Sequence, residues 1–213
     1  MPATTTGDTQ RLRQYWDKHA PRYDRQMRVF DRLLFGDTRA WVCRQASGDT
    51  LEVAIGTGLN LDLYPDDVRL TGVDFSPAML EQARDRAQRL GRTVDLREGD
   101  AHSLQFPDSS FDTVVCTFSL CGIPGERQAV AEMWRVLRQG GLLLMADHVV
   151  SSAWPLRAVQ WLLERVTIPL GGEHLRRRPL DQVRAQGFEL ERQQRFKAGI
   201  VERLAARKAD TTR

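Results

Sequence analysis

Two glycines and an acid carry the clearest chemical signal in the sequence. Gly56 and Gly58 follow a short apolar run, and Asp74 stands at the end of the next apolar run. A glycine turn lets the backbone approach a ligand at the start of a helix, and an acid at the end of the following strand can bind a ribose diol. The spacing therefore predicts a nucleotide-cofactor site with Asp74 as its ribose ligand.

The glycine pattern argues against a dinucleotide cofactor. A dinucleotide site has three glycines in the order G-x-G-x-x-G, and Leu61 occupies the third position here. Glu52, inside the first strand, would sit poorly beside phosphates and suits a ligand with a cationic end. The sequence also lacks an evident Tyr-x-x-x-Lys pair, which disfavours an NAD-dependent oxidoreductase.

Residues 52–58, EVAIGTG, resemble the first motif of the class I S-adenosylmethionine-dependent methyltransferases, in which an acid precedes a short glycine-rich run. Ala54 stands where that family usually has glycine, and its methyl group would narrow the approach to the methionine moiety. The resemblance continues in order through residues 72–80, the ribose segment, and 99–101, the adenine segment. It then covers residues 111–115, the fourth strand, and 135–141, the turn before the fifth strand.

This resemblance implies S-adenosylmethionine as the cofactor, with Asp74 on the ribose and Asp100 on the adenine amine. Each position also has a plainer reading: the glycines could serve a tight turn, Asp74 could cap a helix, and Asp100 could be an ordinary turn residue. His102 could lie near the adenine, but the leading expectation is that it is exposed. The cofactor-binding residues that we predict between the first and fourth strands are Glu52, Ala54, Gly56, Gly58, Asp74, Phe75, Ser76, Met79, Asp100, Ala101 and Thr117.

Residues 15–24 resemble the opening helix of small-molecule methyltransferases, notably the quinone-biosynthesis group, in which a tyrosine-bearing segment folds over the cofactor. Tyr15 and Tyr23 are therefore predicted to be lid residues that contact the cofactor, with plain packing as the alternative. His19, between them, is expected to be exposed.

His148 and Asp112 are the candidate catalytic residues. His148 is expected at the carboxyl end of the fifth strand, where ligands bind in open α/β sheets. An imidazole with a pKa of about 6.5 could remove a proton from an acceptor there, or the side chain could only shape the pocket. Asp147 beside it is expected to point elsewhere, and Asp112 could instead fix the start of the fourth strand.

The predicted acceptor pocket is lined by His148, Cys116, Cys121 and Trp154. The two cysteines flank the end of the fourth strand and are expected to be small apolar wall residues, because methyl transfer needs no enzyme nucleophile; a catalytic thiol is the alternative. Trp154 lies in residues 151–178, where this fold commonly carries an acceptor-covering insertion.

Residues 114–121 and 147–149 look most like animal thiol S-methyltransferases and bacterial phospholipid N-methyltransferases. The leading acceptor is a small lipophilic thiol, since a thiol with a pKa of about 8.5 supplies some thiolate at neutral pH. A phospholipid amine is the closest rival, followed by a quinone-precursor carbon or an oxygen acceptor. No metal is expected. A module that binds the cofactor without transferring methyl is the alternative from another class.

Composition fits a protein with a mixed, solvated surface. The 213 residues carry 31 basic and 28 acidic side chains, a net charge of +3 and a pI near 9.0, with no nucleic-acid-binding motif. No apolar run is long enough for a membrane span, although peripheral contact would accompany a lipid acceptor. The first residues lack an apolar signal region and the three cysteines form no metal-like pair, so we expect a cytoplasmic protein with reduced thiols. The oligomeric state is not predicted.

Alternating patterns predict an α/β fold: one Rossmann-like seven-stranded sheet with helices on both faces and the last strand antiparallel. Residues 1–9 are expected to be disordered. A single domain is predicted over 10–208, with a helical lid at 10–47. Strands are expected near 50–55, 69–74, 94–98, 112–118, 142–147, 188–196 and 200–207, and helices near 59–63, 77–90, 126–138 and 179–186.

Overall fold

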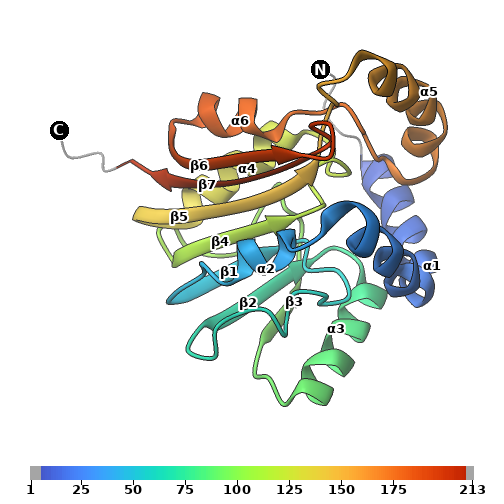
Figure 1. Ribbon diagram of the computed structural model, residues 1–213. Helices are drawn as coiled ribbons and strands as arrows, with labels where there is room; N and C mark the ends of the chain where they lie inside the picture. Colours follow the sequence, from blue (N-terminus) through green and yellow to red (C-terminus); the bar gives the residue numbers. More distant parts are fainter. Residues whose placement is uncertain (1–5, 210–213) are drawn as a thin grey trace.

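The computed structural model describes residues 6–209, which build one seven-stranded sheet in the order β3-β2-β1-β4-β5-β7-β6 (Figure 1). Strands β1 to β5 run parallel, and β7 runs antiparallel to its neighbours β5 and β6. The predicted fold class is therefore confirmed. The strands are β1 Asp49–Val53, β2 Arg69–Asp74, β3 Asp95–Glu98, β4 Phe111–Thr117, β5 Leu137–His148, β6 Phe188–Phe196 and β7 Val201–Lys208.

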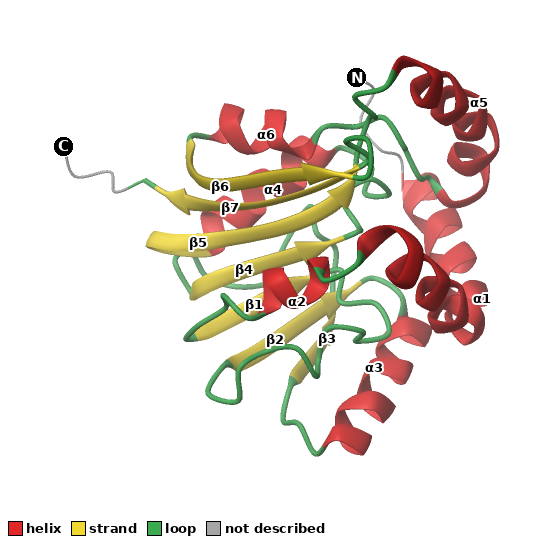
Figure 2. Ribbon diagram, in the orientation of Figure 1, coloured by secondary structure: helices red, strands yellow, loops and turns green. Residues whose placement is uncertain are grey.

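Helices cover both faces of this sheet (Figure 2). Alternate residues of the central strands point to opposite faces, so Val114 and Leu143 join the core beneath α4 and α6, while Val115 and Leu144 join the core beneath α2 and α3. The helices are α1 Thr6–Phe30, α2 Thr38–Cys43, α3 Pro77–Leu90, α4 Glu126–Val136, α5 Trp154–Gly171 and α6 Pro179–Gln186, with a π-helical turn η1 at Asp31–Phe35.

Two predictions of local structure are wrong, one at the N-terminus and one after the glycine turn. Residues 6–9 are helical rather than disordered, whereas residues 1–5 lie outside the described part. Residues 10–47, predicted to hold two helical stretches, form most of α1 together with η1 and α2, and Gly36, with a φ of +58°, ends the π-helical turn. The helix expected at 59–63 is a series of turns, a segment too short to form a stable helix alone.

The start of α3 agrees closely with its sequence signal. Ser76 is the N-cap, and its hydroxyl accepts a hydrogen bond from the backbone N–H of Met79 at 3.2 Å. Pro77 occupies the first helical position, where a missing N–H costs nothing. Gly91 closes the helix in the left-handed conformation.

Gly58 is required by packing as well as by its backbone conformation. Its φ is +74°, and a Cβ at this position would lie 2.7 Å from Leu61 Cδ1 and 3.4 Å from the Cα of Ala83 on α3. We expect Gly58→Ala to lower the free energy of unfolding by about 2 kcal/mol or more, measured by chemical denaturation.

Gly91→Ala is the matched control for this prediction. Gly91 has a similar φ of +63°, but a Cβ at this position would meet nothing within 4 Å. Gly91→Ala should lower the free energy of unfolding by only about 1 kcal/mol, because only backbone strain contributes. Equal losses for the two variants would mean that Gly58 does not set the distance between the glycine turn and α3.

Candidate functional site

A cavity lies at the carboxyl ends of β1, β2 and β4, where the topology predicts a ligand site. Val53 and Ala54 line it at the end of β1, Asp74 at the end of β2, and Phe118 after β4. Helix α1 lines the cavity from its other side, and the segment after α5 contributes one acid. The cavity-lining residues that were not among the predicted site residues are Thr9, Leu12, Trp16, Val53, Val73, Gly99, His102, Phe118, Ser119, Gly122, Ile123, Pro124 and Glu173.

The turn after β1 places three residues in the left-handed conformation. Ala54, Gly56 and Gly58 have φ angles of +56°, +58° and +74°. A Cβ on Gly56 would meet nothing within 4 Å, and Gly56 lines the cavity, so its open side faces the ligand space. Ala54 carries a strain of about 1–2 kcal/mol, which explains why glycine is favoured at this position in the resembling family.

Asp74 connects the glycine turn to the start of α3. Its Oδ2 accepts from the N–H of Gly56 at 2.8 Å, and its Oδ1 accepts from the N–H of Ser76 at 2.9 Å. Burial raises the pKa of this carboxyl to about 6 despite these hydrogen bonds. Asp74 lines the cavity, and Ser76 rather than Asp74 is the N-cap of α3.

Asp100 and His102 form a pair at the cavity wall. Asp100 Oδ1 accepts from the N–H of His102 at 2.9 Å and lies 2.5 Å from its Nδ1, while Nε2 contacts the carbonyl oxygen of Pro124. Since both ring nitrogens face acceptors, the hydrogen bond to Asp100 raises the pKa of His102 and lowers that of Asp100. The expectation that His102 is exposed is wrong; the Asp-x-His spacing was the signal that could have revealed it.

Glu52 and Thr117 lie beneath the glycine turn and do not line the cavity, contrary to their predicted contact with the cofactor. Glu52 accepts from Asn60 Nδ2 at 2.6 Å and from the hydroxyl of Tyr64 at 2.9 Å. Asn60 also donates to Thr117 Oγ1 at 2.9 Å, and Arg39 reaches the same hydroxyl at 3.3 Å. Burial raises the pKa of Glu52 to about 7. These residues support the turn from behind.

Helix α1 is fastened over the cofactor side of the cavity by two acids on one face. Asp17 accepts from Ser76 Oγ at 2.6 Å, and Asp24 accepts from Thr57 Oγ1 at 2.6 Å and pairs with Arg86. These contacts tie the helix to the start of α3 and to the glycine turn.

The predicted lid is present, but other residues of α1 line the cavity. Leu12 and Trp16 do so, whereas Tyr15 stacks on His19 with ring centroids 3.9 Å apart. Tyr23 packs edge-on against Trp16, and burial raises its pKa to about 12. His19 is half-buried by its contact with Tyr15, so its expected exposure is wrong.

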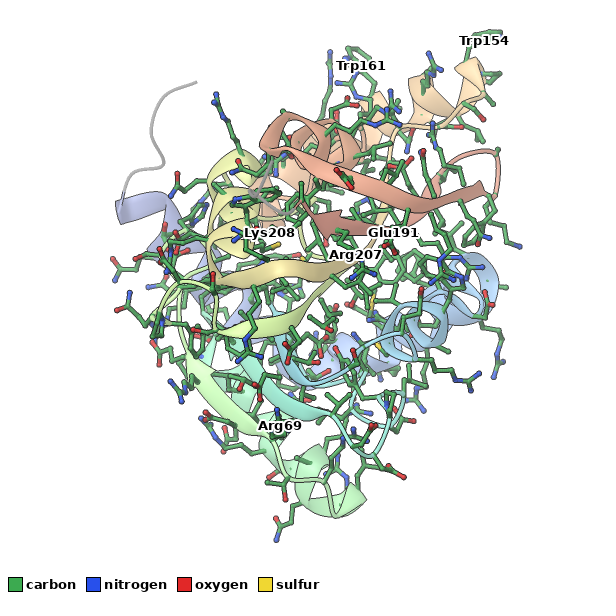
Figure 3. All side chains as sticks on the ribbon, turned by 90° about the vertical axis from the view of Figure 1, so that its left-hand side faces the viewer. Arg69, Trp154, Trp161, Glu191, Arg207 and Lys208 are labelled. Atoms are coloured by element: carbon green, nitrogen blue, oxygen red, sulfur yellow. The ribbon has the colours of Figure 1, made fainter. Side chains whose placement is uncertain are left out.

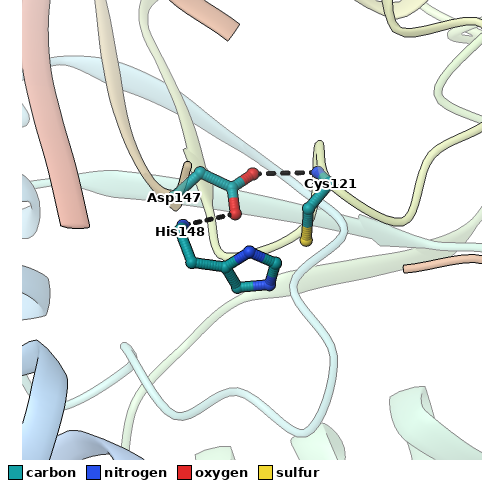
Figure 4. Close-up of side chains that lie close together, drawn as sticks. All are labelled: Cys121, Asp147 and His148. Atoms are coloured by element: carbon teal, nitrogen blue, oxygen red, sulfur yellow. Dashed lines mark hydrogen bonds between the residues drawn. The ribbon is translucent and has the colours of Figure 1, made fainter. Parts of the chain in front are cut away.

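Cys121, Asp147 and His148 gather at the end of β5 (Figure 4). Asp147 Oδ2 accepts from the N–H of Cys121 at 2.9 Å and Oδ1 from the N–H of His148 at 2.8 Å, so Asp147 points toward this group, contrary to expectation. Their ligand-type atoms lie within 4.8 Å of one another, and a metal ion could bind there. Burial and Asp147 raise the pKa of the Cys121 thiol, which disfavours a thiolate ligand or nucleophile.

Glu173 brings a second acid to this side of the cavity. It follows α5, lines the cavity and is close enough to His148 and His19 for their charges to lower its pKa, although burial raises that pKa overall. His148 Nδ1 is buried without a hydrogen-bond partner. The arrangement offers a carboxylate and an imidazole that could bind a cation or take up a proton.

Three predicted site residues lie elsewhere. Asp112 is at the amino end of β4, where it accepts from the N–H of Asp49 at 2.8 Å and pairs with Arg138 at 2.6 Å. Cys116 belongs to the core between the sheet and α4. Trp154 is 79% exposed on the outside of α5. Eight predicted site residues line the cavity, whereas His148 is not among the lining residues. The eight are Ala54, Gly56, Asp74, Phe75, Met79, Asp100, Ala101 and Cys121.

Residues 51–145 match the Methyltransferase domain family. Over 126 residues the chain is 43% identical to a phosphatidylethanolamine N-methyltransferase of Cereibacter sphaeroides (58% of this chain, 62% of the relative). It is 39% identical to a demethylmenaquinone methyltransferase of Deinococcus radiodurans (60% and 56%) and 32% identical to the thiol S-methyltransferase TMT1A of Homo sapiens (62% and 56%). The chain thus spans less than two thirds of each relative's length.

Solved structures share the fold. A putative methyltransferase of Bacillus halodurans superposes with a TM-score of 0.69 at 20% identity, covering 82% of this chain and all of the other. The [4+2]-cyclase SpnF reaches 0.66 at 23% identity (82% and 79%), so the fold by itself does not decide the reaction. Residues 51–145 therefore match a methyltransferase domain, the described chain has the class I methyltransferase fold, and together these similarities indicate S-adenosylmethionine as the cofactor.

Proposed function

We propose that the protein transfers a methyl group from S-adenosylmethionine to a small lipophilic acceptor, and that the leading acceptor is an amine. The observation that carries the choice of an amine is Glu173, a half-buried acid that lines the same cavity as the glycine turn. The similarity to the phosphatidylethanolamine N-methyltransferase supports the same choice.

The cofactor side of the cavity fits S-adenosylmethionine. The open side of Gly56 leaves room for a ligand beside the turn, and the carboxylate of Asp74 retains lone pairs for a ribose diol. Asp100 would accept from the adenine amine, and the pair that it forms with His102 fixes its orientation. Trp16 would cover this side of the ligand.

When bound, the cofactor supplies an electrophilic methyl group on a sulfonium. The residues of the chain must hold the acceptor in line with that group, exclude water and remove a proton that the acceptor carries. Glu173 can bind an ammonium group and receive its proton, because burial raises the pKa of the Glu173 carboxyl toward the higher pKa of an ammonium group. His148 is the neighbouring group that can accept the proton in turn.

Electrostatics distinguish an amine from a thiol acceptor. A thiol reacts as its anion, and the acids Glu173 and Asp147 on this side of the cavity would oppose an anion. The same acids favour an ammonium. A thiol, the leading acceptor from sequence, becomes the second candidate, supported by the similarity to the thiol S-methyltransferase TMT1A.

A labelling screen tests the proposal. The protein is incubated with isotopically labelled S-adenosylmethionine and, separately, phosphatidylethanolamine, alkyl thiols and a quinone precursor, and products are followed by mass spectrometry. Label on the amine is expected. Label on a thiol or on carbon would transfer the assignment to that acceptor, and bound cofactor without any transfer would favour a binding module.

Glu173→Gln should lower kcat about a hundredfold while leaving the cofactor Kd unchanged, because it keeps the shape of the side chain and removes the proton acceptor. Glu164→Gln is the matched control: Glu164 is a buried acid of the same segment that pairs with Arg176 and does not line the cavity. A rate loss equal in the two variants would assign Glu173 a structural function only.

Asp74→Ala should weaken cofactor binding by about 2–4 kcal/mol in titration calorimetry, since it removes charge-assisted hydrogen bonds to the ribose. Asp112→Ala serves as the control, because this acid also accepts a backbone N–H but stands at the opposite end of the sheet. Both variants are compared at a temperature well below their unfolding transitions. Near-wild-type affinity of the Asp74 variant would contradict the ribose assignment.

Cofactor affinity should depend on pH through Asp74. A ribose diol donates to the ionised carboxylate, whose pKa is about 6 without cofactor, so protons compete with the cofactor below that pH. Affinity should fall up to about tenfold per pH unit as the pH drops below 6. Asp74→Asn should flatten this dependence; an unchanged slope in that variant would assign it to another group.

The raised pKa of Asp74 has the opposite effect on the stability of the cofactor-free protein, which falls as the pH rises. The pKa of Asp74 is raised above its usual value of 3.8, so the protonated form stabilises the fold. Its contribution is present at low pH and is lost as the pH rises through about 6.

A further inference from the structure

Helix α5 reverses the usual arrangement of a surface helix, because its inward stripe is polar. Gln160 and Glu164 are each only 6% exposed. Gln160 Nε2 donates to the carbonyl oxygens of Val149 and Leu175 at 2.9 Å, and Glu164 accepts from the backbone N–H and the Nε of Arg176 at 2.9 and 2.6 Å. A surface helix normally buries its apolar stripe, so polar contacts hold α5 in place.

Large apolar side chains cover the outward face instead. Of the eleven that are exposed in the described part of the chain, seven lie on α5 and only one, Leu90, on α3. Trp154 and Trp161, 79% and 47% exposed, project away from the body of the molecule (Figure 3). A concentrated apolar surface of this kind marks an interaction site. The seven residues are Trp154, Val159, Trp161, Leu162, Leu163, Val166 and Leu170.

The exposed charges of α5 are all positive. Arg157 and Arg165 are exposed, and the guanidinium of Arg165 lies 3.9 Å from the ring centroid of Trp161. The one acid of the helix, Glu164, is turned inward. Tryptophan, leucine and arginine on the free face of a helix suit the boundary between acyl chains and anionic headgroups. Within residues 6–209, none of the helices has the length and apolar character needed to cross a membrane.

A second exposed patch also combines apolar and basic side chains. It lies at the end of α1 and in η1, at the carboxyl end of the sheet where α5 also stands (Figure 1). Helix α1 lines the cavity through Trp16, and the segment after α5 lines it through Glu173. The exposed apolar and basic residues of this second patch are Arg25, Arg28, Val29, Phe30, Arg32 and Leu33.

We propose that the outward face of α5 docks on the surface of a membrane that contains anionic lipids. The apolar side chains enter the acyl boundary, and the arginines meet lipid phosphates. A second copy of the chain is a poorer occupant, because both sides of a two-fold contact through this face would carry the same positive charge without an exposed acid of α5 to offset it. Docking requires neither cofactor nor acceptor and goes beyond the proposed methyl transfer.

Cosedimentation of the cofactor-free protein with vesicles tests the docking. Vesicles of phosphatidylcholine alone are compared with vesicles of equal parts phosphatidylcholine and phosphatidylglycerol. We expect binding to the mixed vesicles that weakens with added salt and is much weaker without phosphatidylglycerol. The double variant Trp161→Ser, Leu162→Ser should lose affinity at least about tenfold, whereas Leu90→Ser on α3 should bind as the wild type does.

A charge variant separates electrostatic from apolar contributions. Arg165→Glu should weaken binding to the mixed vesicles about tenfold, and Arg89→Glu on α3, also exposed, should not. Thermal unfolding of each variant establishes that it is folded; if the double variant is not, Arg165→Glu and the salt dependence decide.

Three results would overturn the docking proposal. The first is a wild-type protein that binds neither vesicle. The second is undiminished binding by folded variants of α5. The third is a wild-type dimer in analytical ultracentrifugation that the α5 variants convert to monomers, which would assign the face to a second copy. Because the assay contains no S-adenosylmethionine and no added acceptor, its failure leaves the proposed methyl transfer standing.

Discussion

The cofactor side of the cavity depends on the buried carboxylate of Asp74. A charge taken out of water is costly unless it is hydrogen-bonded, and Asp74 obtains its hydrogen bonds from the backbone of Gly56 and Ser76. The carboxylate can be satisfied only if the left-handed turn after β1 and the start of α3 lie on either side of it. One side chain at the end of β2 thereby fixes two backbone segments, and the raised pKa of Asp74 reflects the cost of that burial.

Polar contacts extend this constraint to the lid and to the layer beneath the turn. Thr57, inside the turn, donates to Asp24 of α1, while Asn60 just after it donates to Glu52 beneath. The turn is therefore held from above and from below. Because an unsatisfied buried polar group costs about 1–3 kcal/mol, the helix α1, the turn and the support beneath it must adopt compatible positions together. This coupling explains why a helix distant in sequence lies over the cavity.

The sequence predicted what depends on local pattern and missed what depends on side-chain direction. Apolar alternation and the cap at Ser76 placed α3 and most strands to within one or two residues, whereas β5 begins at Leu137, five residues before the predicted start. The sequence also indicates whether a residue lies at the start or at the end of a strand. Asp112 lies at the start of β4, away from the carboxyl ends where ligands bind, and should have been excluded on that ground. Glu52 was misplaced because spacing does not reveal that Asn60 and Tyr64, brought together by the fold, occupy both of its oxygens.

Helix α5 shows why the acceptor side was the hardest to predict. The position of this segment in the resembling family suggested a cover over the acceptor, with Trp154 lining the acceptor pocket, whereas the structure exposes Trp154. This exposure occurs because Gln160 and Glu164 find strong partners in the adjoining loop and on Arg176. Burying those groups against protein leaves the tryptophans outside. A polar anchor, an apolar outer face and an acid-lined cavity beside them are consistent with an acceptor that has a lipophilic body and a cationic end.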